Sequence, residues 1–256
     1  MYATSGKEQV LILVKALPHV SGNYGETVCC AGVTQDKQWR RQYPIRFRYL
    51  KDNKFTRWQW VEYEWRLSKD RRPESRRVVE ESIRPLESMK ERDRSAFLHS
   101  LVLGSTKEAE QRGQSLALIR PHVPKFSWKK KSNEEIVTER HKYAEAVRQL
   151  NLFDVNEEMR ALEPCPYEFR FSFSTDSGSH NHVCLDWETS ATFFKFRLKY
   201  GEQAALEKMQ KIFGEQYIQK GMVFAMGTHS VHPQWLLLGV IRLDPPPRQG
   251  LLPLDD

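Results

Sequence analysis

Apolar and polar residues alternate most clearly in two stretches of the chain, residues 39–49 and residues 167–174. In the first, aromatic and aliphatic residues take most of the odd positions, while Arg40, Arg46 and Arg48 take even ones. In the second, Tyr167 and three phenylalanines alternate with polar residues. Successive side chains of a strand point to opposite faces, so both stretches are predicted to be strands with one buried face.

Further apolar runs add strands to both halves of the chain. Residues 10–14, 26–33 and 58–66 join the first alternating stretch, and strands at this spacing predict a small antiparallel barrel or rolled sheet. Residues 115–119 are predicted to be a strand that returns to this first domain. After residue 165, the pattern predicts strands at 167–174, 182–188, 222–226 and 235–242, with helices at 189–200 and 202–213.

The middle of the chain has helical spacing. Helices are predicted at 86–103, at 106–112 and in the segment that follows Ser132, and residues 125–131 are interpreted as a basic linker. The predicted fold class is therefore α+β, with two β-rich modules, each barrel-like or a rolled antiparallel sheet, joined by a helical middle region. The predicted division is 1–125 (basic β-rich domain with appended helices), 126–164 (basic linker and helical connector) and 165–256 (second α+β domain).

Charge is distributed unevenly along the chain. The formal net charge is +7, and residues 1–125 carry nine more cations than anions, whereas the rest carries two fewer cations than anions. A polyanionic partner for the first half is one explanation, and a generally soluble basic surface is the other. Residues 1–9 are polar and no apolar run approaches a membrane span, so a cytoplasmic protein with no membrane partner is expected. The spacing of the four cysteines favours reduced thiols over a disulfide framework.

The basic and aromatic segment from residue 39 to residue 65 is the first candidate site. Sheet faces that bind single strands combine cations for phosphates with aromatic rings for bases. The predicted contact residues are Arg40, Arg46, Arg48, Lys51, Lys54, Arg57, Trp58 and Trp60. Val61, Tyr63 and Trp65 have the opposite parity and are predicted to be core. The alternative is that the tryptophans are buried and that the arginines pair with Glu62 and Glu64.

Residues 180–188 form the second candidate site. If they continue a strand, His182, Cys184, Asp186 and Glu188 share one face, and His180 joins them from the turn. Such a set could hold zinc through His180, His182, Cys184 and Asp186, or a harder divalent metal through the two carboxylates. A metal-dependent nuclease would then use Asp186, Glu188 and His182 as catalytic residues. The alternative is a polar sheet face with a structural role for Asp186.

No other motif indicates catalysis. The chain has no P-loop, no dinucleotide fingerprint and no G-x-S-x-G elbow, so no catalytic residue is assigned in the main interpretation and whether the protein is an enzyme stays open.

Four segments carry a family resemblance: GETVCCAGV at 25–33, WRRQYPIRFR at 39–48, YEFRF at 167–171, and His182 with DWE at 186–188. Together they resemble an uncharacterised group of bacterial proteins whose fold is expected to contain OB-like barrels. The resemblance also implies a cysteine pair before the histidine, giving a zinc-like cluster, but this chain has no cysteine at 175–179. The group implies no activity and no catalytic residues.

Three functional hypotheses follow. The first is a nucleic-acid-binding protein, or a subunit of a nucleoprotein complex, that contacts a DNA or RNA backbone without a cofactor. The second is a nuclease that depends on a divalent metal at Asp186 and Glu188. The third is an assembly subunit that contacts other proteins and not nucleic acid. Salt-sensitive oligonucleotide binding separates the first from the third.

Overall fold

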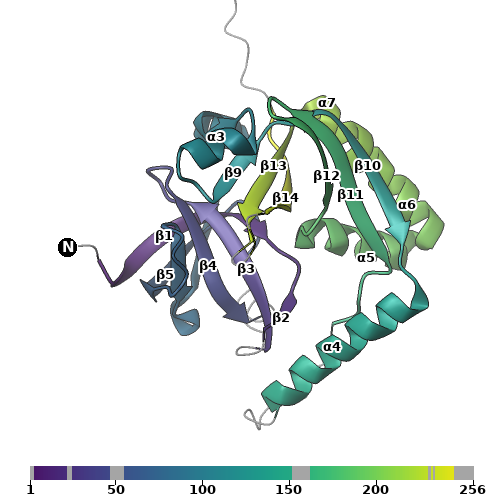
Figure 1. Ribbon diagram of the computed structural model, residues 1–256, viewed down its shortest axis with the longest axis horizontal. Helices are drawn as coiled ribbons and strands as arrows, with labels where there is room; N and C mark the ends of the chain where they lie inside the picture. The colour runs from purple at the N-terminus through teal and green to yellow at the C-terminus, as the bar shows by residue number, and fades with distance from the viewer. Residues whose placement is uncertain are drawn as a thin grey trace, which may run out of the picture.

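The computed structural model describes residues 3–21, 25–46, 55–151, 162–229, 232 and 234–244 (Figure 1). The protein is α+β, as predicted: a five-strand mixed β-barrel forms the N-terminal part, and further sheets with helices follow. The strands of the first part are β1 (Ser5–Lys15), β2 (His19–Ser21), β3 (Gly25–Val33), β4 (Trp39–Arg46), β5 (Gln59–Leu67), β6 (Ser75–Val78) and β7 (Arg84–Ser88).

The barrel closes because β1 pairs with two neighbours. It runs antiparallel to both β3 and β5, and the remaining circuit passes from β3 through β4 and β6 back to β5. The β4–β6 pairing is parallel, which makes the barrel mixed. Its interior is a cluster of buried side chains that includes Val10, Ile12, Val28, Val61 and Tyr63. The predicted core parity of β5 is therefore confirmed.

One irregularity in β4 changes which side chains face the interior. Val28 pairs with Ile45, but Cys30 pairs with Gln42, so β4 advances three residues where β3 advances two. This is a β-bulge, and an extra residue reverses the alternation beyond it. Ile45 and Gln42 consequently both face the barrel interior, where the Gln42 amide donates to the Tyr63 hydroxyl at 3.2 Å. Trp39 and Arg41 face outward, against the rest of the protein.

The second half contains two sheets and several helices. A three-stranded sheet has the order β10-β11-β12, and a four-stranded sheet has the order β14-β13-β9-β8. These elements are β8 (Val102–Leu103), β9 (Leu116–Ile119), β10 (His122–Lys130), β11 (Tyr167–Thr175), β12 (Gly178–Val183), β13 (Met222–Thr228) and β14 (Trp235–Arg242). The helical elements are η1 (Glu80–Ser82), α2 (Glu91–Leu98), η2 (His99–Leu101), α3 (Thr106–Gln111), α4 (Asn133–Asn151), α5 (Trp187–Tyr200), α6 (Glu202–Lys211), η3 (Ile212–Gln216) and α7 (Tyr217–Lys220).

The alternating segment at 167–174 forms β11 as predicted, and its burial alternates along all nine residues. Phe169 packs edge-to-face with Phe193 of α5, and Phe171 packs in the same way against Phe224 of β13. Helices α5 and α6 thus cover one face of the β10–β12 sheet, as Figure 1 shows. Aromatic pairs at these centroid distances contribute about 0.5–1.5 kcal/mol each beyond area burial.

A shared apolar cluster joins the barrel to the four-stranded sheet, and we call this contact the seam. It combines Leu11 and Leu13 of β1 with Leu118 of β9 and Val223 of β13. Backbone pairing crosses the seam too, because Ala16 forms a bridge with Asp186. The prediction that residues 115–119 return to the barrel is wrong: β9 pairs with β13 and β8.

Three smaller observations complete the fold. Residues 125–131 were predicted to be a linker, but most of them belong to strand β10. All four cysteines carry free thiols. Among the described helices, none combines the length and the apolar character that a membrane span requires.

Candidate functional site

A cavity of about 900 Å³ lies at the seam. Three parts of the chain line it. The barrel contributes residues of β3, β4, β6 and the loop 68–72; the C-terminal part contributes the start of α5, residues 228–229 and β14; α4 and residues 162–165 close the third side. Ligand-binding sites commonly occupy roughly 300–1,000 Å³ and occur between domains, so this cavity is a candidate functional site.

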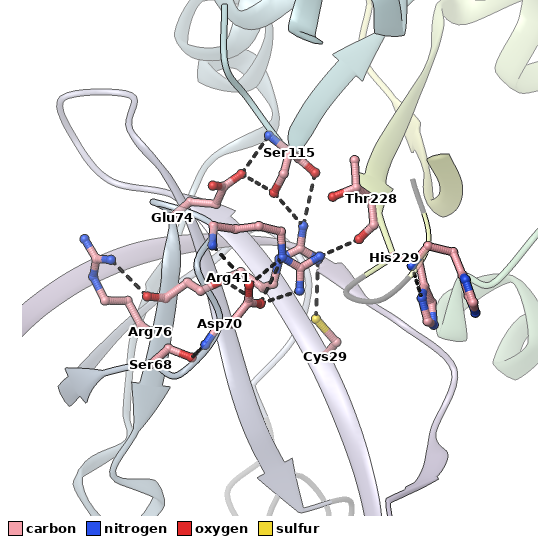
Figure 2. A network of polar contacts seen from close by, with 12 residues as sticks. Cys29, Arg41, Ser68, Asp70, Glu74, Arg76, Ser115, Thr228 and His229 are labelled. Carbon is pink, nitrogen blue, oxygen red and sulfur yellow. Dashed lines mark hydrogen bonds and ion pairs between the residues drawn. The ribbon is translucent and has the colours of Figure 1, made fainter. Parts of the chain in front are cut away.

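Arg41 lies at the base of the cavity and is only 4% exposed. The bulge in β4 turns it outward from the barrel. Its Nη2 donates to the carbonyl oxygen and the hydroxyl of Ser115, both at 3.1 Å. Its Nη1 has a weaker contact, 3.9 Å from the thiol sulfur of Cys29. Figure 2 shows this guanidinium at the centre of a polar network between strands of the two halves.

Glu74 is linked to Arg41 through Ser115. One carboxylate oxygen of Glu74 accepts from the backbone N–H of Ser115 at 3.0 Å and from its hydroxyl at 2.6 Å. The buried cation and the buried anion are therefore bridged by one serine, which lies just before β9. Two buried atoms in this group, Nε of Arg41 and Oε2 of Glu74, have no hydrogen-bond partner among the described residues.

A second polar link crosses the seam beside the first. Asp70 accepts hydrogen bonds from the Arg72 guanidinium and from the Ser75 hydroxyl, and Arg72 also donates to the carbonyl of Thr228 at 2.5 Å. Partial burial acts to raise the pKa of Asp70, but these hydrogen bonds outweigh burial and lower it below its usual value. Arg72 is thus held by a carboxylate on one side and by the end of β13 on the other.

Cations outnumber anions on the cavity wall. Six cationic side chains line it, namely Arg41, Lys69, Arg72, Arg76, Arg77 and Lys131, against the three carboxylates of Asp70, Glu139 and Glu163. Arg72 pairs with Asp70 and Lys131 pairs with Glu139. Within the described part of the chain, Arg41, Lys69 and Arg77 have no carboxylate within 4.0 Å. The cavity is therefore basic after internal pairing.

Aromatic rings occupy other parts of the same wall. Tyr43, Tyr143, Trp187 and Phe194 line the cavity and are each half-buried. The hydroxyl of Tyr143 donates to the carbonyl of Pro18 at 3.4 Å, which ties α4 to the barrel. The wall thus combines cations with flat apolar surfaces, the combination that binds phosphate and base together.

The predicted basic face of β4 has a different character. Arg40 donates to Glu8 at 2.8 Å, and Arg46 donates to Glu80 at 2.6 Å, so internal carboxylates already neutralise both. The alternative partners were also wrong, because Glu62 pairs with Lys7 instead. Three predicted contact residues, Arg48, Lys51 and Lys54, lie outside the described residues.

Trp58 and Trp60 were predicted to be exposed stacking residues, and this exposure is wrong. They are 9% and 7% exposed and belong to the apolar cluster of the seam. Trp60 packs edge-to-face with Phe97, and the Arg94 guanidinium lies 4.5 Å from the ring centroid of Trp58. Their parity was right, but α2 and the C-terminal sheet cover that face, so neither ring can stack on a base without rearrangement.

Arg57 and Asp186 form a buried ion pair across the seam, at 2.6 Å. Asp186 is 1% exposed and also accepts from the backbone N–H of Val240 and the hydroxyl of Thr189. Its carboxylate caps the N-terminus of α5 by accepting from the Glu188 N–H. Burial raises the pKa of Asp186, although Arg57 opposes that effect. A smaller cavity of about 340 Å³ lies beside this pair.

The predicted metal ligands do not come together. Cys184 is buried, and burial raises the pKa of its thiol to about 12. His180 and His182 stack beside Phe173 on β12, and partial burial lowers the pKa of both. Glu188 pairs with Lys15 at 3.0 Å.

Among the described residues no group of three or more His, Cys, Asp or Glu side chains could hold a metal ion. With Asp186 committed to Arg57 and the α5 N-terminus, the catalytic set Asp186, Glu188 and His182 has no support in this arrangement.

Sequence reasoning missed Arg41, Arg72, Glu74 and Ser115. Arg41 stood within the alternating stretch at an odd position, where a cation among apolar residues was the one available signal. Nothing local indicates that Glu74 meets a serine 41 positions later.

Comparison with known proteins gives two family matches and no activity. Residues 6–103 match a domain of unknown function (DUF8758), and residues 99–254 match a second domain of unknown function (DUF8757). No curated protein matches the chain. The two matches overlap at η2 and β8, and the cavity lies between the two regions because residues of both line it. Since the second match covers more than half of the chain, the chain belongs to the family of the domain of unknown function DUF8757.

Proposed function

We propose that this protein binds a single strand of nucleic acid in the cavity at the seam. The observation that carries the proposal is the wall of the cavity, where Arg41, Lys69 and Arg77 have no carboxylate partner among the described residues and half-buried aromatic rings lie on the same wall. Phosphates need cations that are not already neutralised, and bases need flat apolar surfaces.

The cavity supports this function better than the outer face of β4 does. Arg40 and Arg46 each contact a carboxylate at 2.8 Å or less, and a phosphate would have to displace that carboxylate. Lys69 and Arg77 are exposed at the cavity rim, so a phosphate meets them at no such cost. In this proposal the two rim cations contact the backbone of the strand.

The aromatic side of the cavity would hold bases. Tyr43, Trp187 and Phe194 come from β4 and α5, and a base between them would be largely removed from water. Stacking of a base on an aromatic side chain contributes about 1–3 kcal/mol and depends little on base identity. Binding should therefore tolerate many sequences.

The test is fluorescence anisotropy with a labelled single-stranded oligonucleotide over a range of salt concentrations. The variant Lys69→Glu/Arg77→Glu reverses both rim charges without breaking an ion pair of the described residues. We expect binding at about 50 mM salt to weaken by roughly 10- to 100-fold. The slope of log K against log salt should become shallower by about 1.4, because each lost contact to a single-stranded phosphate removes about 0.7.

Lys107→Glu/Lys211→Glu is the matched control. It makes the same change of net charge at two exposed lysines that do not line the cavity. We expect it to weaken binding by no more than about threefold, through the general field of the protein. Equal losses in the two double variants would show that the cavity has no special part. Absence of wild-type binding at low salt would refute nucleic-acid binding altogether.

A further inference from the structure

The base of the cavity, by which we mean its buried inner wall, differs from its exposed rim. Ala16, Arg41 and Leu238 form part of the inner wall and are 8%, 4% and 6% exposed, whereas Lys69 and Arg77 at the rim are exposed. A groove that binds the middle of a strand must be open at both ends. A strand that enters this cavity from the rim meets a wall of packed side chains instead, so the cavity suits an end of a strand.

The base carries a cation whose donors are incompletely used. A guanidinium has five N–H donors in a fixed fork. In Arg41, Nη2 reaches Ser115, Nη1 has only the thiol of Cys29 at 3.9 Å, and Nε has no partner among the described residues. Thiol sulfur is a weak acceptor. Buried charged groups with unused donors are costly. Nε is itself buried, so an anionic ligand oxygen would bind the fork at Nη1, where it would replace the weak contact with the thiol.

The buried carboxylate of Glu74 does not use these donors. Glu74 accepts from Ser115, not from the Arg41 guanidinium, and no ion pair of Arg41 within 4.0 Å exists among the described residues. The positive charge of Arg41 is therefore only partly balanced inside the protein. It faces a cavity whose rim is also cationic.

We propose that the base of the cavity, through Arg41, binds the terminal phosphate of a nucleic-acid strand. This inference rests on the proposed function and narrows it from a strand to a phosphorylated strand end. A phosphate monoester carries about −1.5 to −2 charges at neutral pH and three strong acceptor oxygens, whereas an internal phosphodiester carries one charge. Arg forks bind such groups with charge-assisted hydrogen bonds. The last bases would then lie on the aromatic side of the cavity, and the preceding phosphates would meet Lys69 and Arg77.

The test compares oligonucleotides of one sequence with an internal fluorophore. The set is a 5′-phosphorylated strand, a 3′-phosphorylated strand, a strand with two hydroxyl ends, and a circular strand that has no end. We expect one phosphorylated strand to bind at least about tenfold more tightly than the hydroxyl-ended strand. The circular strand should bind more weakly still, and its affinity should depend on the salt concentration and not on any strand end.

Arg41→Lys keeps the charge but removes the fork, and it should abolish the preference for the phosphorylated end. Arg120→Lys is the control, because Arg120 is half-buried and does not line the cavity. Thermal melting identifies whether Arg41→Lys remains folded. If it does not, the comparison of circular and linear strands with the wild-type protein still tests the strand-end inference.

The outcomes separate the two proposals. Equal affinity for circular, hydroxyl-ended and phosphorylated strands overturns the strand-end inference and leaves the proposed function standing. Binding of no oligonucleotide overturns both. Adenosine monophosphate is tested in parallel as a free source of the same phosphate chemistry. If it binds and no oligonucleotide does, the site takes mononucleotides, and both the strand-end inference and the proposed function are refuted.

Discussion

The ion pair between Arg57 and Asp186 allows a sharp test of what holds the seam together. Asp186→Ala removes the acceptor for Arg57 at 2.6 Å, for the Val240 N–H at 3.2 Å and for the Glu188 N–H at 3.3 Å. A buried charge left without its partner costs about 3–5 kcal/mol. The lost N-cap of α5 adds about 1 kcal/mol, and contacts this close are not additive. We therefore expect a loss of about 4 kcal/mol in the free energy of unfolding.

The assay is thermal melting monitored by circular dichroism. A loss of 1 kcal/mol lowers Tm by about 2–4 °C in a chain of this size, so Asp186→Ala should melt about 8–16 °C below the wild type. Asp186→Asn serves as the companion variant, because asparagine caps helices well and its carbonyl can still accept from Arg57. It should lose less stability than Asp186→Ala, because one oxygen can still accept from Arg57 and the Glu188 N–H, whereas the amide nitrogen that replaces the other oxygen cannot accept from the Val240 N–H.

A double-mutant cycle then isolates the pair. Arg57→Met alone leaves the Asp186 carboxylate buried and uncompensated, so it should be strongly destabilising. Combined with Asp186→Asn, it should cost less than the sum of the two single changes, because no buried charge remains. If Asp186→Ala melts within about 2 °C of the wild type, the structural role assigned to this carboxylate is wrong. The metal-dependent nuclease would then become worth testing again.

Three further changes test other parts of the fold. Cys184→Ala should reduce the loss of stability at alkaline pH. Burial raises the pKa of the Cys184 thiol to about 12, so the stability that the neutral thiol contributes is intact below about pH 9 and is lost as pH rises toward 12. Urea melts at pH 8 and pH 10 should show about 1.4 kcal/mol less loss in the variant. Ser115→Ala removes the hydroxyl between Arg41 and Glu74 and should cost about 1–3 kcal/mol in chemical unfolding; an unchanged midpoint would contradict the bridging role. Gly32→Ala would place a Cβ 2.1 Å from a carbonyl oxygen of β1, so it should lower Tm by several degrees, whereas Gly113→Ala, with open space around it, should lower Tm less and only through its positive φ.

Much of the fold could be predicted because its signals are local. The alternation at 167–174 and the apolar runs at 222–226 and 235–242 correspond to β11, β13 and β14. Helices α5 and α6 begin and end within two residues of the predicted bounds. The predicted helix at 86–103 begins too early and ends too late, because strand β7 pairs with β5 before α2 begins at Glu91, and η2 ends at Leu101 before β8. Strand pairing of that kind depends on partners such as Val61 and Pro85, which are distant in the chain, and leaves no local pattern.

The candidate site was much harder to predict. The alternation that predicted a basic face for β4 fails at the bulge, and a bulge has no clear signature in the residues themselves. Arg41 is thereby turned outward against Ser115, while Arg40 meets Glu8 near the end of the barrel. Parity also shows which face of a strand a side chain lies on, but not whether water or a second layer of protein covers that face. For this reason Trp60 was predicted to be exposed. Both errors arise from contacts between residues distant in the chain.

The apolar cluster at the seam has a consequence for how this protein can be divided. Leu11 and Trp60 from the first family region share one apolar core with Leu118, Val223 and Ile241 from the second. A fragment ending near residue 103 would expose half of that core to water, and so would the complementary fragment. We therefore expect each fragment alone to be prone to aggregate, and the two regions to be stable only when they pack together. The boundary between the two family matches is therefore not a boundary between independently folding domains. We expect the two regions to unfold together.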